Sequence, residues 1–145
     1  MGNGITGWGY EGRAVADLIA FARAMGAEWV VDVRLNPISR KPGFSKKTLT
    51  AVLVAEGLHY LHLPALGNPK DNRAGFADAT GADGRHARER YRSEVIDTDR
   101  AAAALEQLRT LDTTGGAVLL CFEADARTCH RAEVERALNV LSLAA

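Results

Sequence analysis

Two short segments contain most of the side chains that could take part in chemistry. The first, residues 121–131, reads Cys-Phe-Glu-Ala-Asp-Ala-Arg-Thr-Cys-His-Arg. Its thiols, carboxylate and imidazole are groups that enzymes use as nucleophiles, acids and bases. The free N–H groups at a helix start attract anions and favour an ionised thiol. We therefore expect Glu123, Cys129 and His130 to carry the chemistry and Arg131 to hold an anion. Cys129, His130 and Arg131 are expected in the first turn of a helix.

The same segment matches the C-x5-R spacing of the phosphate loop of tyrosine phosphatases, from Cys121 to Arg127. Glu123 and Asp125 lie inside that loop, and their charges would oppose both phosphate and an ionised thiol. An arginine at that distance is also common by chance. We therefore do not expect a phosphatase, and we expect Cys121 to be a small buried residue.

A metal site and a redox pair are two further possibilities for this segment. Its cysteines, histidine and Glu123 are all zinc ligand types. Adjacent side chains on a helix point about 100° apart, so Cys129 and His130 are not expected to reach one ion. No CxxC or HxxxH pair supports a site either, so we predict no metal and no cofactor. A redox pair of Cys121 and Cys129 requires the intervening loop to fold back.

The second segment, residues 32–47, reads Asp-Val-Arg-Leu-Asn-Pro-Ile-Ser-Arg-Lys-Pro-Gly-Phe-Ser-Lys-Lys. Asp32 and Arg34 share one side of a strand because they are two residues apart. We expect Asp32 to orient a partner or act as a general base, although a structural ion pair with Arg34 is the alternative. The basic residues of the segment form a patch near a helix start, which suits a bound anion or a solvated surface. The side chains expected to contact the anion are Arg34, Ser39, Arg40 and Ser45.

A third cluster, residues 85–92, has four arginines, a histidine and a tyrosine. Such a cluster can bind nucleic acid through charge and stacking. The acidic residues Glu94, Asp97 and Asp99 follow closely and could neutralise it. We favour a solvated helix with internal ion pairs.

The elements that must position these segments alternate along the chain. Short apolar runs predict strands at 4–7, 28–34, 58–63 and 117–121. Helical periodicity and end signals predict helices at 15–25, 45–56, 85–93 and 98–111, and a last one from Thr128. Residues 67–84 are rich in Gly, Asn and Asp, which predicts an exposed excursion.

This alternation predicts one α/β domain over residues 1–145, a three-layer sandwich of a mainly parallel sheet with helices on both faces. In such sheets, ligands bind in the crevice beyond the carboxyl ends of the strands. Asp32, Arg34 and Cys121 all lie at predicted strand ends. We therefore expect both chemical segments to meet at one edge of the sheet.

Composition limits the class of partner. The chain has 145 residues, and its 18 basic and 18 acidic side chains cancel. No global field therefore draws it to nucleic acid or to an anionic membrane. No apolar run reaches the roughly 18 residues of a membrane span. Two cysteines do not indicate a disulfide framework, so we expect a cytoplasmic protein with no membrane partner.

The motifs DVR-x2-P-x-SR and C-x-E-x5-CHR together resemble those of the family called domain of unknown function 488. Further matches are Gly-Phe-Ser at 43–45 and Gly-Leu-His-Tyr at 57–60. The resemblance covers nearly the whole chain and implies a compact α/β fold with a site built from both segments. It implies no activity. Trp8 stands where the family's opening often carries a polar pair such as Gly-His.

Taken together, these features favour an enzyme that binds a small anionic ligand, bearing phosphate or carboxylate, with a nucleotide as the first candidate. A non-catalytic module that binds nucleic acid is the first alternative. A thiol or redox protein that uses Cys121 and Cys129 is the second.

Overall fold

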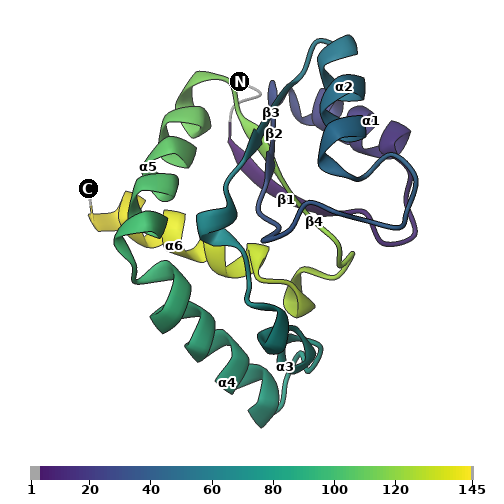
Figure 1. The fold of residues 1–145 in the computed structure, drawn as a ribbon. Coiled ribbons are helices and arrows are strands. Elements are labelled where there is room, and N and C mark those ends of the chain that lie inside the picture. Colours follow the sequence, from purple (N-terminus) through teal and green to yellow (C-terminus); the bar gives the residue numbers. More distant parts are fainter. Residues whose placement is uncertain (1–3, 145) are drawn as a thin grey trace.

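Four parallel strands form the centre of the protein (Figure 1). The computed structural model describes residues 4–144. The strand order is β1-β4-β2-β3, and every neighbouring pair is parallel. This confirms the predicted parallel sheet. The strands are β1 (Ile5–Gly9), β2 (Trp29–Asp32), β3 (His59–His62) and β4 (Ala117–Cys121).

Among the residues that the structure describes, six helices surround the sheet, joined in places by short helical turns. The helices are α1 (Val15–Met25), α2 (Lys46–Ala55), α3 (Arg73–Phe76), α4 (Ala82–Tyr91), α5 (Asp99–Thr114) and α6 (Arg131–Ala144). The 3-10 turns are Pro64–Leu66, Lys70–Asn72 and Ala126–Thr128, and a π-helical turn covers Arg92–Ile96. Within residues 4–144, no helix combines the length and apolar character needed to span a bilayer.

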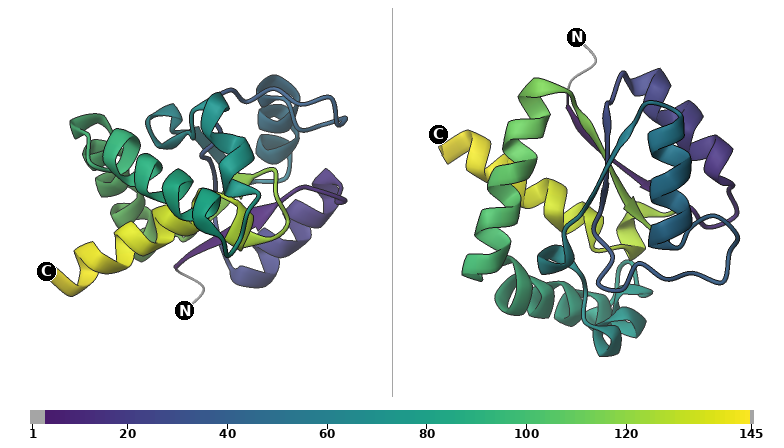
Figure 2. Two further views of the ribbon diagram at one scale, coloured as in Figure 1. Left: turned by 90° about the horizontal axis from the view of Figure 1, so that it is seen from below. Right: turned by 45° about the horizontal axis from the view of Figure 1, so that its top comes forward.

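The helices cover both faces of the sheet, as predicted. Successive residues of β2 point to opposite faces, so Val30 packs with α1 and α2 while Val31 packs with α5 and α6. Val118 and Leu119 of β4 divide in the same way. The right-hand view of Figure 2 shows these two helical layers on either side of the strands. The result is a three-layer sandwich with two apolar cores.

Two helix ends follow directly from the sequence. Gly26 has a left-handed φ of 70° and its N–H closes the last turn of α1, a conformation that glycine adopts without steric cost. Ser45 occupies the N-cap position of α2, as predicted. Its hydroxyl does not cap the helix, because it accepts instead from the Ser39 N–H at 3.1 Å and donates to the Ser39 carbonyl at 3.2 Å.

Residues 67–84 differ from the predicted exposed excursion. They contain a 3-10 turn, α3 and the start of α4, and Asn72 and Phe76 are buried. The ring of Phe76 packs edge-on against Tyr91 at 6.0 Å. One aromatic side chain therefore anchors a stretch whose composition is otherwise typical of a loop.

The start of α6 also differs from the prediction. The helix begins at Arg131, and Cys129 is extended, with φ −129° and ψ 143°. Asp125 accepts a hydrogen bond from the Arg127 N–H, which starts a 3-10 turn rather than the α-helix. The prediction that Cys129 and His130 lie in the first helical turn is therefore wrong.

The helix that follows β4 packs on the opposite face of the sheet from the helices that follow β1 and β2. After β4 it enters α6, which packs on one core, whereas α1 and α2 pack on the other. Such a change of face opens a crevice at the carboxyl edge of a parallel sheet. In Figure 1 this edge is the lower end of the strands, next to α3 and the start of α6.

Candidate functional site

A cavity of about 210 Å³ lies at the carboxyl edge of the sheet, and we call it the rim cavity. It brings together the ends of β1, β2 and β4 with α3 and the loop that precedes α6. Its lining residues are Tyr10, Arg34, Leu35, Asn36, Ile38, Asn68, Arg73, Phe76, Cys121, Phe122, Glu123, Thr128 and His130.

A buried ion pair forms one wall of the rim cavity. Asp32 is fully buried and Arg34 is 5% exposed. The Asp32 carboxylate accepts from Arg34 Nε at 2.8 Å, from Nη2 at 2.7 Å and from the Arg34 N–H at 3.1 Å. It also accepts from the Tyr60 hydroxyl at 2.6 Å. Both carboxylate oxygens of Asp32 are thus occupied, and the side chain does not line the cavity.

The same contacts fix the charge and orientation of Arg34. Burial alone would lower its pKa, but the hydrogen bonds and charge of Asp32 outweigh burial and raise the pKa. The guanidinium therefore stays charged. Within the described chain its Nη1 has only a long hydrogen bond, 3.5 Å, to the Tyr10 hydroxyl. Asp32 thus positions a charged Arg34 that has one donor group left to serve the cavity.

Two thiols and an imidazole meet at another wall. Nδ1 of His130 lies 3.7 Å from Cys121 Sγ and 3.9 Å from Cys129 Sγ. Nε2 lies 2.7 Å from the Val33 carbonyl oxygen, which can only accept, so Nε2 carries the proton. All three side chains are at least nine-tenths buried. We call this group the Cys121–Cys129–His130 cluster.

Burial also determines the state of Cys129. It raises the pKa of this thiol well above its ordinary range, and contact with Cys121 adds to the effect. For His130, burial lowers the pKa, but contacts with Cys129 and the Val33 carbonyl and the charge of Glu123 outweigh burial. The net pKa of His130 is raised. Cys129 does not line the rim cavity.

Glu123 and Arg131 have different surroundings. Glu123 is half-buried and lines the cavity, with Oε2 3.5 Å from Cys121 Sγ. Arg131 is buried, and it donates from Nη1 to the Glu123 carbonyl and from Nη2 to the Ala124 carbonyl at 3.0 Å. Its guanidinium thus holds the backbone of the loop and does not line the cavity.

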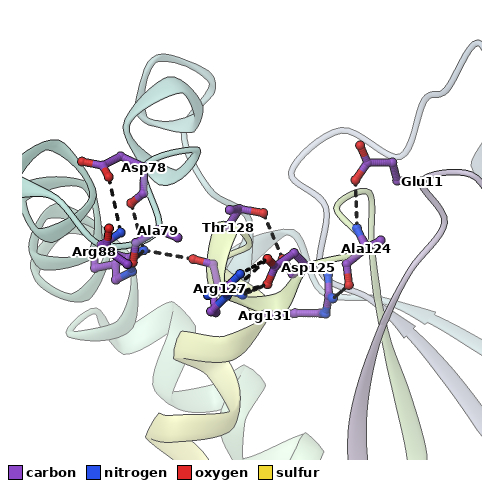
Figure 3. A network of polar contacts seen from close by, with 10 residues as sticks. Glu11, Asp78, Ala79, Arg88, Ala124, Asp125, Arg127, Thr128 and Arg131 are labelled. Atoms are coloured by element: carbon purple, nitrogen blue, oxygen red, sulfur yellow. Dashed lines mark hydrogen bonds and ion pairs between the residues drawn. The ribbon is translucent and has the colours of Figure 1, made fainter.

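Other side chains hold the rest of this loop (Figure 3). The Ala124 N–H donates to Glu11 at 3.1 Å, and Arg88 donates to the Arg127 carbonyl at 2.9 Å. Arg127 pairs with Asp125 at 2.9 Å, and its side chain is 72% exposed. The C-x5-R spacing therefore does not bring the Arg127 guanidinium to the cavity. Contacts with the turn that follows β1 and with α4 therefore hold the loop after β4 from both sides.

The family model for the domain of unknown function DUF488 matches residues 14–138, which include both chemical segments. The chain belongs to the DUF488 family. Comparisons with curated proteins and with solved structures find no match. The matched region starts after β1, so Tyr10 lies outside it.

In this DUF488 protein, the polar side chains after Arg34 serve mainly to shape their own loop. Ser45 Oγ accepts from the Ser39 N–H at 3.1 Å, and Ser39 Oγ accepts from the Lys41 N–H at 3.1 Å. Neither serine lines the rim cavity. Arg40 is exposed and also lies outside the lining. Five residues were expected to bind the anion, and Arg34 is the one among them that lines the cavity. The other four are Ser39, Arg40, Ser45 and Arg131.

The basic cluster 85–92 of this DUF488 protein forms one of the local ion pairs expected from the sequence, Arg90 with Glu94, and otherwise pairs with Asp71 and Glu133 from other elements. Arg90 pairs with Glu94 at 2.6 Å and with Asp71 at 2.9 Å. Arg92 pairs with Glu133 at 2.6 Å. These contacts neutralise much of the local positive charge.

Some lining residues were not predicted. Tyr10 directly follows β1, so the carboxyl-edge rule could have included it. Arg73 and Phe76 come from the segment predicted as a loop, and no pattern in the sequence links them to the site. Their position depends on the packing of Phe76 against Tyr91.

Proposed function

We propose that this DUF488 protein is an enzyme that binds an anionic substrate in the rim cavity, with Arg34 as the anion-binding group. One observation carries the proposal: a buried, charged guanidinium, held by Asp32, lines the same cavity as the reactive side chains Cys121, Glu123 and His130. A guanidinium fixed in advance loses little freedom when it binds phosphate or carboxylate. Asp32 is then a positioning residue, since its oxygens are already occupied.

The walls of the rim cavity favour an anion attached to an apolar or aromatic group. Ile38 and Phe122 are 77% and 46% exposed, and both line the cavity. Phe122 also packs edge-on against Tyr10 at 5.2 Å. Arg73 adds a second cation at the exposed side. A phosphate ester with a flat ring, such as a nucleotide, has the matching chemistry.

We assign the role of general base to Glu123. It is half-buried, it lines the cavity, and it lies beside Cys121. His130 is less suited to transfer a substrate proton, because Nε2 is bound to the Val33 carbonyl and Nδ1 faces two sulfur atoms. A carboxylate of this kind can accept a proton when it reaches hydrogen-bond distance of the substrate.

Calorimetric titration with phosphate and with adenosine monophosphate tests the proposal. Arg34→Lys keeps a cation beside Asp32 but uses its single ammonium there, so we expect binding to weaken roughly 10- to 150-fold, from about 1.5–3 kcal/mol for a charged hydrogen bond. Arg73→Gln should weaken binding less. Arg127→Gln is the control, because Arg127 lies outside the lining.

Equal affinity of the wild type, Arg34→Lys and Arg73→Gln would remove the basis of the proposal. A nucleic-acid module predicts a different result, namely tight binding of oligonucleotides with a steep dependence on salt and no effect of Arg34→Lys. The acidic partners of Arg90 and Arg92 make that module the weaker candidate.

A further inference from the structure

We propose that Cys121, Cys129 and His130 form a three-ligand site for a transition metal of the zinc type, set in the wall of the rim cavity. This site goes beyond the proposed binding of an anion and does not depend on it. The three ligand atoms all lie within 4.8 Å of one another.

The spacing of the ligand atoms is close to that of a tetrahedral zinc site. Bonds of about 2.3 Å to sulfur and about 2.0 Å to nitrogen place neighbouring S and N ligands about 3.5 Å apart. His130 Nδ1 lies 3.7 Å from Cys121 Sγ and 3.9 Å from Cys129 Sγ. The two N–S distances therefore exceed the tetrahedral value by only a few tenths of an ångström. The two sulfur atoms, which would be about 3.8 Å apart around zinc, lie within 4.8 Å of one another.

The histidine already has the orientation that a metal requires. The Val33 carbonyl accepts from Nε2 of His130 at 2.7 Å, so Nδ1 is the ring nitrogen that faces the two sulfur atoms. A hydrogen bond of this kind to the distal ring nitrogen is the usual support of a metal-bound histidine, because it fixes the tautomer and the ring plane.

The backbone explains how neighbouring residues reach one ion. Cys129 is extended and precedes α6, so its side chain and that of His130 are not held at the helical angle of about 100°. Cys121 comes from the end of β4. Arg131 bonds to two carbonyls of the intervening loop and so keeps both halves of the site in place.

The donor set determines which metal is favoured. Two thiolates and one imidazole suit Zn²⁺ and Co²⁺ and do not suit Mg²⁺ or Ca²⁺, which prefer oxygen. Three protein ligands leave one tetrahedral position for water or a substrate atom, as in catalytic zinc sites. Cys121 and His130 line the rim cavity, and Glu123 lies 3.5 Å from Cys121 Sγ. The open position therefore faces the cavity, beside Glu123.

Titration of the reduced, chelator-treated full chain with Co²⁺ under anaerobic conditions tests this site. We expect one Co²⁺ per chain, with the thiolate-to-cobalt charge-transfer band and the intense visible bands of a tetrahedral site, and displacement of Co²⁺ by Zn²⁺. Cys121→Ser, Cys129→Ser and His130→Gln should each lose or strongly weaken these bands. His86→Gln is the matched control, because His86 is exposed on α4.

Circular dichroism identifies any variant that fails to fold, and Glu123→Gln provides a variant of a non-ligand neighbour that should retain the bands. Lack of a thiolate band in the folded wild type overturns the proposal. So does a thiolate band that both Cys121→Ser and Cys129→Ser leave unchanged, since the ion would then be bound elsewhere. Arg34→Lys separates the two proposals: it should weaken phosphate binding roughly 10- to 150-fold and leave Co²⁺ binding unchanged.

Discussion

Replacing Asp32 with asparagine removes the negative charge from a carboxylate that accepts four hydrogen bonds. The remaining oxygen can serve the Arg34 N–H and Nε, as Oδ1 does now. The new amide group then faces Arg34 Nη2, which can only donate, and the Tyr60 hydroxyl, which can rotate to accept. The best arrangement therefore loses at least one direct contact and leaves the buried guanidinium without its counter-charge.

The size of the effect follows from burial. Removing one partner of a buried ion pair costs about 3–5 kcal/mol, because the other charge is left uncompensated. For a domain near 150 residues, each kcal/mol corresponds to about 2–4 °C in Tm, so Asp32→Asn should lower Tm by roughly 6–20 °C. Tyr60→Phe leaves the ion pair intact and removes one charged hydrogen bond, so it should cost less, about 1.5–3 kcal/mol.

Urea unfolding, followed by circular dichroism, measures these free energies, and a double variant isolates their cause. Asp32→Leu combined with Arg34→Met leaves no buried charge, so it should be less destabilising than Asp32→Asn alone. A cost below about 1 kcal/mol for Asp32→Asn, or a double variant less stable than Asp32→Asn, would refute the claim that Asp32 holds the charge of Arg34.

Three further predictions follow from other parts of the site. Gly9→Ala would place a methyl group on the backbone carbonyl of Glu123, so the loop after β4 must move, and urea unfolding should show a loss of about 1–3 kcal/mol or more. Burial, with a hydrogen bond to Asp32 for Tyr60, raises the pKa of Tyr60 and Tyr91 above 10.0. The unfolded chain therefore releases these protons first, and stability measured between pH 10 and 11 should fall by up to about 1.4 kcal/mol per pH unit for each tyrosine, a slope that Tyr→Phe variants reduce. Arg127→Ala should leave Tm nearly unchanged in a thermal melt, because the ion pair of Arg127 with Asp125 is on the surface.

The sequence predicted the sheet and both helical layers because these depend on repeated patterns. Several apolar residues in succession indicate the strand β4, and several apolar residues at helical spacing indicate the helix α1. The rule that ligands bind at the carboxyl edge then placed Asp32, Arg34 and Cys121 near one another, and Arg34 and Cys121 do line one cavity. This level of prediction needs only the order and direction of the strands.

Individual side chains depend on contacts that no spacing reveals. Arg131 turns to the carbonyls of its own loop, whereas Arg34 reaches the cavity, although both are arginines at the same sheet edge. The helical angle between Cys129 and His130 did not apply, because capping by Asp125 delays the start of α6. A hydrogen bond to one side chain, that of Asp125, thus starts a 3-10 turn ahead of α6 and leaves Cys129 and His130 before the helix. The objection that helical geometry keeps these two side chains from sharing a metal ion therefore does not hold.

The most direct test of the central claim is a crystal structure of the protein grown or soaked with tungstate, whose anomalous scattering locates the anion. We predict a tungstate in the rim cavity, within hydrogen-bond distance of Arg34 Nη1, and a much lower occupancy in Arg34→Lys crystals soaked at the same concentration. An anion bound only elsewhere on the protein, or equal occupancy of the cavity in Arg34→Lys crystals across a series of tungstate concentrations, would contradict the proposal.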